Sequence, residues 1–343
     1  MNKFSLKIKG ISCCVPARRI SNSAYVKKNK VKNGEKLISL IGINYRHQAE
    51  KDTCTSDLVE KAINKLIQRI NWKKSEIGLL IFVSQTADYL TPCTSAILQE
   101  KLKFPKNLLA FDINLGCSGY SHGIGICYAL MNTLNIKKCI LAVGDISTQT
   151  INIMDHSNKI LFGDAGSATA LELSKDKIDH EFKYMSDGSG YNDIIIPAHS
   201  LSGRNKLTIK SLTETKDNKN QVNLHLNGAN IYSFAINNVP DFVIKNLNRK
   251  GIKYCFFHQA NKMIQDQLAL SLNKKLNKKV IFPNSIEYYG NTSSASIPVT
   301  ICHNFYNKKI SGLSLLCGFG VGLSMSSIIV DLSRTTILKI IKY

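Results

Sequence analysis

Short runs of consecutive apolar residues recur along the chain and predict strands that are buried on both faces. Unbroken rather than alternating apolarity is typical of the strands of a layered α/β protein. These runs are residues 77–83 (IGLLIFV), 108–113 (LLAFDI), 139–143 (CILAV), 254–257 (YCFF) and 313–317 (LSLLC). The run at residues 312–330 is long enough to resemble a membrane span, but it contains four Gly and four Ser. We therefore predict two buried strands joined by a tight loop there, and no membrane insertion.

Between these runs, apolar residues recur at the spacing of helices that are buried along one face. Residues 56–70 begin with Ser and Asp, and their apolar positions are Leu58, Val59, Ala62, Ile63, Leu66 and Ile67. This spacing predicts an amphipathic helix. Further helices are predicted at residues 93–103, 118–134, 229–247, 260–272 and 293–306. The alternation of strands and helices indicates the α/β class.

Three landmarks recur at one offset of 174 residues. Ser84-Gln85 after one predicted strand matches His258-Gln259 after another, Gly116-Cys117-Ser118 matches Gly290-Asn291-Thr292, and Gly144 matches Gly318. A shared spacing predicts a duplicated α/β unit, with halves at residues 1–175 and 176–343. Sites in such sheets form beyond the carboxyl ends of strands, so equivalent strand ends from both halves should meet. The polar stretch at residues 204–223 is expected to be a surface excursion, and residues 334–343 a disordered or surface-packed extension.

Composition excludes some classes of protein. The chain has 343 residues, of which 44% are hydrophobic and 20% charged, and this is ordinary for a globular protein. Its net charge of +21 predicts attraction to an acidic partner such as nucleic acid, an anionic membrane or an acidic carrier protein. The lysines are scattered among Asn and Ile, however, which favours solvated surface charge. We find no nucleic-acid-binding motif and expect no such partner.

The ten cysteines include no CxxC pair, and most lie in apolar segments. This pattern favours free thiols in a reducing cytoplasm over disulfides or a metal site. The first residues, MNKFSLKIKGISCC, lack the apolar region of a signal peptide, so we expect none.

Cys117 is the strongest candidate nucleophile. It lies in NLGCSGY, between a buried strand and a helix of small residues. Backbone N–H groups at a helix N-terminus favour a thiolate, so this position is typical of a reactive cysteine. The alternative is a buried structural cysteine, which is the commoner fate of a single Cys.

Two candidates come from the second half. His258 follows an apolar strand in FFHQAN, where an imidazole can orient a carbonyl or act as a base, or can be a core histidine bonded to backbone. Asn291 lies in YYGNTSSAS, where a helix cap is the alternative, but its offset from Cys117 favours a functional role. Asp164, in GDAGSATAL, is interpreted as an organiser of backbone turns. The GFGVG loop at residues 318–322 carries plausible oxyanion donors.

The motifs NLGCSGY, FGDAGSATAL, HQAN, GNTSSAS and GFGVGLS together resemble the β-ketoacyl-acyl-carrier-protein synthase III family, in order and spacing, over residues 5–332. The resemblance implies the five-layered αβαβα thiolase fold with two pseudo-symmetric halves, and a homodimer. It implies no metal or cofactor, since CoA or phosphopantetheine thioesters are the substrates. Cys117 would accept an acyl group, and the N–H groups of Cys117 and Val321 would bind the oxyanion.

The resemblance further implies a decarboxylative Claisen condensation. His258 and Asn291 would hydrogen-bond the carbonyl of a malonyl-acyl-carrier protein, whose enolate attacks the acyl-enzyme. Phe319, Asn261 and Thr91 are candidate substrate-binding residues. Thr91 stands where short-primer enzymes have a Phe contributed across the dimer, so we expect a deeper acyl pocket. Lys262, Lys274 and Lys275 are candidates for docking the carrier protein.

Some residues depart from the family pattern. The Trp and Arg that clamp the CoA adenine are replaced by Lys36 and His156, and Arg residues expected near Leu40 and at Met263 are missing. This favours a carrier-bound acyl donor or another pose of CoA. Two other functions stay open. One is transfer of the acyl group from Cys117 to an oxygen, nitrogen or sulfur nucleophile. The other is a catalytically silent binding partner, although a complete Cys, His and Asn set argues against it.

Overall fold

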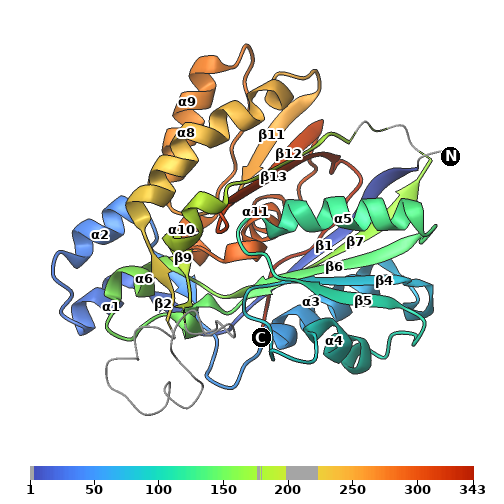
Figure 1. The fold of residues 1–343 in the computed structure, drawn as a ribbon, viewed down its shortest axis with the longest axis horizontal. Helices are drawn as coiled ribbons and strands as arrows, with labels where there is room; N and C mark the ends of the chain where they lie inside the picture. The colour runs from blue at the N-terminus through green and yellow to red at the C-terminus, as the bar shows by residue number, and fades with distance from the viewer. Residues whose placement is uncertain (1–3, 176–177, 179, 198–222) are drawn as a thin grey trace.

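The computed structural model describes residues 4–175, 178, 180–197 and 223–343. Of the polar stretch expected to be a surface excursion, all but Asn223 lies outside the described residues. Two large sheets and three layers of helices build the described part of the chain (Figure 1). All five strands predicted from apolar runs are present, and each predicted helix lies within about three residues of its predicted place.

The first sheet is formed mainly by the N-terminal half. Its strands β1, β7, β6, β4 and β5 are neighbours in that order, and β14 and β15 both pair with β1. Because none of the described residues pairs with β5 on its outer side, it is an edge strand. The strand bounds are β1 (Ser5–Val15), β4 (Leu79–Val83), β5 (Leu109–Ile113), β6 (Lys138–Asp145), β7 (Ala165–Ser174), β14 (Thr336–Ile337) and β15 (Ile341–Lys342).

The second sheet repeats the arrangement of the first. Its order is β11 (Ile252–Phe257), β12 (Leu313–Gly320), β13 (Ser324–Asp331) and β8 (Phe182–Ser186). In the parallel pair β4 and β6, Val83 lies opposite Val143, and in β11 and β12 Phe257 lies opposite Cys317. Both members of the second pair stand 174 residues after those of the first. The two pseudo-symmetric halves are therefore confirmed.

Helices separate and cover the two sheets. Helices α5 (Gly119–Thr133) and α11 (Ser296–Phe305) lie between the sheets and share one apolar core with both (Figure 1). Helices α3 (Thr55–Ile70) and α4 (Thr94–Leu102) cover the outer face of the first sheet. Helices α8 (Gly228–Leu247) and α9 (Lys262–Lys275) cover that of the second. This is the expected αβαβα order.

Small residues let α5 lie at the centre. A Cβ atom added at Gly123 would stand 2.8 Å from the Leu141 side chain of β6, closer than packed carbon atoms approach.

The apolar run at residues 312–330 forms the antiparallel hairpin of β12 and β13, as predicted. Within the described residues, no helix combines the length and the apolarity needed to cross a bilayer.

Short elements border the ends of the sheets. They are β2 (Arg19–Ser21), α1 (Asn22–Lys28), α2 (Gly34–Ile41), β3 (Tyr45–His47), η1 (Lys74–Glu76), η2 (Ser147–Thr150), α6 (His156–Leu161), η3 (Gly188–Asp193), β9 (Ile194–Ile195), β10 (His225–Leu226), α10 (Ile286–Tyr289) and η6 (Ser293–Ala295).

The end of the chain is a surface-packed extension, one of the two expected alternatives, and is not disordered. Strands β14 and β15 join the edge of the first sheet, and the Tyr343 N–H donates to the Val15 carbonyl at 2.9 Å. Parallel backbone pairing gives this basic tail a fixed place. The division of the chain at residue 175 stays a prediction, and these last residues return to the sheet of the other half.

Candidate active site

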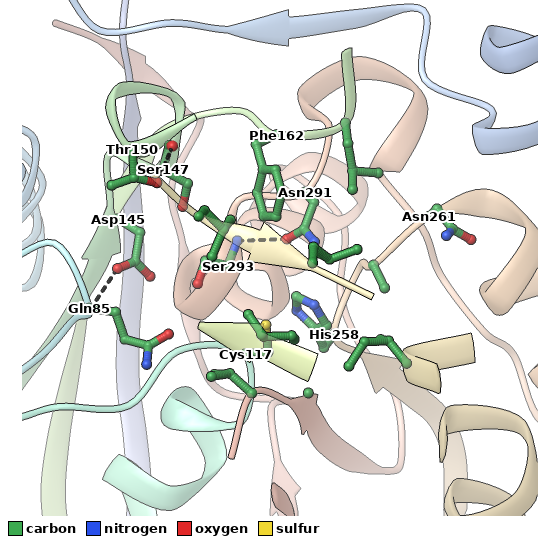
Figure 2. Close-up of a pocket in the computed structure, with 18 of the residues that line it drawn as sticks. Gln85, Cys117, Asp145, Ser147, Thr150, Phe162, His258, Asn261, Asn291 and Ser293 are labelled. Carbon is green, nitrogen blue, oxygen red and sulfur yellow. Dashed lines mark hydrogen bonds between the residues drawn. The ribbon is translucent and has the colours of Figure 1, made fainter. Parts of the chain in front are cut away.

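The three candidate catalytic residues line one cavity of about 100 Å³ at the carboxyl ends of the strands of both sheets. Cys117 precedes α5 in the first half. In the second half, His258 follows β11 and Asn291 precedes α11. Figure 2 shows their side chains turned toward a common space, with Ser293 beside Asn291. The spatial convergence predicted from the 174-residue offset is therefore present in the structure.

The thiol of Cys117 is surrounded by protein and only partly exposed. Burial raises its pKa to about 11, and the negative charge of Asp145 acts in the same direction. The N–H groups of Val321 and Cys117 and the hydroxyl of Ser293 hydrogen-bond the sulfur and lower the pKa. The sequence predicted a helix N-terminus that favours the thiolate. The N–H groups do favour the thiolate as predicted, but desolvation of the thiol outweighs them, so the pKa is raised.

The same contacts are made by the backbone groups predicted to be oxyanion donors, a role that stays a prediction. The N–H groups of Val321 and Cys117 both reach the sulfur, so they lie next to any carbonyl carbon bonded to it. Gly320 makes this approach feasible. Its φ is +149°, and an added Cβ would lie 2.7 Å from the Cβ and 2.9 Å from the Sγ of Cys117. A side chain at Gly320 would therefore collide with the nucleophile.

His258 is buried and held on several sides. Its Nδ1 lies 2.7 Å from the Ser296 hydroxyl, its backbone N–H donates to the Cys317 carbonyl at 2.9 Å, and its ring meets Phe319 edge-on. Burial lowers the pKa of His258 to about 3, against a hydrogen bond with the Ser293 backbone that raises it. The imidazole is therefore neutral at physiological pH. A Ser296 hydroxyl that donates to Nδ1 leaves Nε2–H as a hydrogen-bond donor.

Asn291 is fixed by backbone from both halves. Its N–H donates to the Leu161 carbonyl at 2.9 Å, and its own carbonyl accepts from the Gly163 N–H at 3.0 Å. The side-chain Oδ1 accepts from the Ser293 N–H at 2.9 Å. With its oxygen held in this way, Asn291 offers its Nδ2–H groups to the cavity. A functional role for Asn291, rather than that of a helix cap, stays a prediction.

Sequence reasoning missed Ser293 and Ser296, although both stand in the GNTSSAS motif. Ser293 contacts Cys117 through its hydroxyl, and His258 and Asn291 through its backbone. Its φ of +48° is uncommon for a residue with a side chain, and such strain often marks functional sites. No signal in a run of four small polar residues reveals which one adopts this conformation.

The structural prediction for Asp164 is confirmed. The Asp164 carboxylate accepts from the Ala49 N–H at 2.8 Å and from the N–H and hydroxyl of Thr148, so it organises turns as interpreted. All ten cysteines, each within the described residues, are free thiols. Among those described residues no group of three or more His, Cys, Asp or Glu could hold a metal ion.

The candidate substrate-binding residues do not all reach this cavity. Phe319 lines it and packs against His258, and Asn261 lines it while its Oδ1 caps α9 through the Ile264 N–H at 2.8 Å. Thr91 is exposed and lies outside the residues that line the cavity. Its neighbours Tyr89 and Leu90 line a second hollow beside it, so within one chain Thr91 does not close the acyl pocket.

The candidate docking lysines form no single patch. Lys262 begins α9 and pairs with Asp266, whereas Lys274 and Lys275 end this helix about 18 Å away, at a rise of 1.5 Å per residue. Lys275 is held by Asp241 at 3.0 Å, and Lys274 is exposed. Only Lys262 stands next to residues of the cavity, namely Asn261 and Ile264.

Lys36 and His156, at the positions of the family's adenine clamp, are not arranged as a clamp. Lys36 is exposed on α2, and the Nδ1 of His156 lies 2.9 Å from the Tyr25 hydroxyl. The His156 ring also meets Tyr25 edge-on, which occupies one side of the imidazole. Leu40 and Met263 are 51% and 40% exposed where the family pattern has Arg. The surface around α2 and the start of α9 is thus less basic than the resemblance implies.

Comparison with known proteins assigns the family. The profile of 3-oxoacyl-[acyl-carrier-protein] synthase III matches residues 111–188, and that of its C-terminal part matches residues 244–332. A solved structure of 3-oxoacyl-(acyl-carrier protein) synthase from Burkholderia xenovorans is 32% identical with a TM-score of 0.88, covering 98% of this chain and 97% of its own.

Curated relatives agree with this assignment. The β-ketoacyl-[acyl-carrier-protein] synthase III of Streptococcus agalactiae is 30% identical, over 86% of this chain and 90% of its own length. The synthase III of Acholeplasma laidlawii is 28% identical, over 96% of this chain and the whole of its own. The chain therefore belongs to the 3-oxoacyl-[acyl-carrier-protein] synthase III family, and it is an acyl-transferring condensing enzyme of the thiolase fold.

Proposed function

We propose that the chain condenses an acyl thioester with a malonyl-acyl-carrier protein through an acyl-enzyme on Cys117. The observation that carries this proposal is the meeting of Cys117, His258 and Asn291 in one cavity, with two backbone N–H groups on the sulfur. A nucleophile with oxyanion donors suits acyl transfer, and neutral side-chain donors suit the stabilisation of an enolate.

In the first half-reaction, the sulfur of Cys117 attacks the carbonyl carbon of the incoming thioester. The new S–C bond forms as the C–S bond to the donor breaks, and the thiol proton ends on the departing thiol. The N–H groups of Cys117 and Val321 stabilise the oxyanion of the tetrahedral intermediate.

In the second half-reaction, the malonyl thioester carbonyl lies against His258 and Asn291. The bond between C2 and the carboxylate breaks, carbon dioxide leaves, and the electron pair forms an enolate whose oxygen both donors stabilise. C2 then attacks the acyl-enzyme carbonyl, the C–C bond forms, and the sulfur of Cys117 leaves and takes up one proton. The reaction draws only on thioester substrates, so no further cofactor enters it.

Product analysis with malonyl-carrier protein tests this proposal. We expect stoichiometric carbon dioxide and a product longer than the acyl donor by two carbons. Acyl transfer to an oxygen, nitrogen or sulfur nucleophile without carbon dioxide release would overturn the condensation and favour the second candidate function. The neutral state of His258 and the presence of Asn291 favour condensation, since both serve the enolate.

The acyl group is proposed to be longer than acetyl and to arrive on a carrier protein. The cavity at Cys117 shares Gln85, Thr86 and Val321 with a hollow of about 990 Å³, so an acyl chain has room to extend. The engaged His156 and exposed Lys36 argue against the usual CoA clamp. Mass spectrometry of the acyl-enzyme from CoA and carrier-protein thioesters of two to twelve carbons tests both points. A clear preference for acetyl-CoA would contradict them.

A homodimer is proposed to close that hollow. Strand β5 is an edge strand, and Leu109 on it is 37% exposed. Tyr89 and Leu90, which line the hollow, are 63% and 74% exposed. An open edge beside exposed apolar side chains favours pairing with a second copy, which would bring Thr91 of the partner toward the acyl pocket. Light scattering of the purified chain tests this; a monomer at micromolar concentration would contradict it.

A cytoplasmic location and docking of an acidic carrier protein complete the proposal. The free state of the ten cysteines supports a reducing compartment. The charge of +21 and the position of Lys262 beside the cavity support attraction of an acidic carrier to this face. Lys262→Glu should raise KM for the carrier substrate, while Lys274→Glu, at the far end of α9, should change it less.

A further inference from the structure

One carboxylate beside the nucleophile has no role in the reaction described so far. Asp145 ends β6, is 1% exposed and lines the cavity with Cys117. Its Oδ1 accepts from the Gln85 N–H at 2.8 Å, from the Ser84 hydroxyl at 3.1 Å and from the Thr86 hydroxyl at 3.3 Å. Its Oδ2 accepts from the Ser294 hydroxyl at 2.6 Å and from the Ser294 N–H at 3.1 Å.

These five donors come from both halves of the molecule. Ser84, Gln85 and Thr86 follow β4 of the first half, whereas Ser294 lies in η6 of the second, three residues after Asn291. The carboxylate therefore ties the strand ends of the first half to the turn that carries Ser293. Figure 2 shows Asp145 on the side of the cavity near Gln85, with Ser293 between it and Asn291.

These five donors also explain how the carboxylate of Asp145 is tolerated in a buried place. No Lys or Arg is among the described residues that line the cavity, so hydrogen bonds rather than an ion pair stabilise the carboxylate. A buried carboxylate is costly unless it is fully hydrogen-bonded, and charge-assisted bonds are stronger than neutral ones.

We propose that Asp145 is a positioning residue for the condensation, which holds the turn of Ser293 and Asn291 against Cys117 and shapes the electrostatic field at its thiol. This inference rests on the proposed function of the cavity. It assigns Asp145 no contact with substrate atoms, because it acts through Ser294, Ser293 and the electrostatic field at the sulfur.

The charges around the sulfur favour this role. Cys117, Asp145 and His258 are the ionisable groups among the described residues lining the cavity. Burial keeps His258 neutral by lowering its pKa to about 3, so Asp145 carries the net charge that faces the thiol. Its negative charge adds to burial in raising the pKa of Cys117. A protonated thiol resists oxidation and stray alkylation, which protects the enzyme between turnovers.

The test compares Asp145→Asn with Asp164→Asn. Asparagine keeps the shape of Asp145 but removes the charge and replaces one acceptor oxygen by a donor. We expect iodoacetamide to label Cys117 of Asp145→Asn faster, by about threefold or more at pH 8, with the pH profile moved to lower pH. Asp164 is an equally buried, hydrogen-bonded carboxylate outside the cavity lining. Asp164→Asn should leave the labelling profile unchanged.

A second variant separates position from charge. Ser294→Ala removes the 2.6 Å hydroxyl contact but keeps the carboxylate. It should slow malonyl decarboxylation by about three- to tenfold with an unshifted labelling profile. This variant also decides the matter if Asp145→Asn does not fold. An unchanged profile in Asp145→Asn, or full decarboxylation activity in Ser294→Ala, would overturn the inference. Labelling needs no turnover, so a failed condensation assay would instead count against the proposed function.

Discussion

The two halves of the molecule share strand order and register, yet their equivalent strand ends carry different chemistry. The first half supplies a thiol between β5 and α5 and a carboxylate at the end of β6. The second half supplies an imidazole after β11, a carboxamide before α11 and the Val321 N–H after β12. The duplicated scaffold thus sets where the side chains meet. The residues at matched positions set which chemical groups each half contributes.

Burial affects the two halves in opposite directions. It raises the pKa of Cys117 to about 11 and lowers that of His258 to about 3. Both groups are therefore uncharged at neutral pH, because desolvation always favours the neutral form. Neutral donors suit a site in which negative charge develops on a substrate oxygen.

The largest expected effect is the loss of one reaction step without the other when Cys117 or His258 is replaced. Cys117→Ala should abolish the acyl-enzyme and reduce condensation by on the order of 10⁴-fold or more, yet leave malonyl decarboxylation near the wild-type rate. His258→Ala should still form the acyl-enzyme but lose decarboxylation by about 10²–10³-fold. Intact-protein mass spectrometry and carbon dioxide release measure the two steps. Loss of both steps in each variant would contradict a division of labour between the halves.

A steric change should disable the first half-reaction alone. In Gly320→Ala the new Cβ would stand 2.7 Å from the Cβ of Cys117, in a backbone conformation that disfavours side chains. We expect acyl-enzyme formation to slow by on the order of 10²-fold, because reacting atoms tolerate little misplacement. The matched control is Gly188→Ala, which meets no atom within 4 Å. Equal rates of acylation in the two variants would refute the steric argument.

The pH dependence of decarboxylation should show that His258, in the second half, stays neutral. With a pKa of about 3, His258 stays neutral from pH 5 to 8, so decarboxylation by Cys117→Ala should show no transition near pH 6.5. The unfolded chain protonates this His near pH 6.5 and the folded chain does not. The contribution of neutral His258 to stability is thus complete above pH 6.5 and declines as the pH falls toward 3. A rate profile with a midpoint near 6.5 would show that His258 titrates like an exposed imidazole.

The smallest expected effect concerns one hydrogen bond. Ser296→Ala removes the hydroxyl that lies 2.7 Å from Nδ1 of His258. We expect a loss of about 1 kcal/mol, or roughly fivefold in decarboxylation, with acyl-enzyme formation spared. Steady-state carbon dioxide release compared with burst acylation measures this contrast. An equal decline in both rates would mean that Ser296 supports the fold rather than the imidazole.

The alternation of apolar runs and helical spacing was sufficient to predict the layered architecture. Strand β4 at Leu79–Val83 and helix α3 at Thr55–Ile70 lie where their patterns place them, because complete burial leaves a strong signal in the sequence. The repeated offset also predicted that Cys117 and Asn291 would meet. The end of the chain was not predictable in this way, since β14 and β15 are two residues each and depend on β1 for pairing.

Tertiary structure alone decided the electrostatics and supporting contacts of the site. The helix start at Cys117 predicted a stabilised thiolate, but the protonation state depends on how much water the surrounding layers exclude. The hydroxyl of Ser296 and the φ of Ser293 likewise follow from packing against the other half. The sequence by itself determined the fold and the three side chains that meet, because the periodicity of apolar residues and the repeated offset of the motifs are properties of the sequence. Their pKa values and their link to Asp145 arise only when both halves desolvate one cavity.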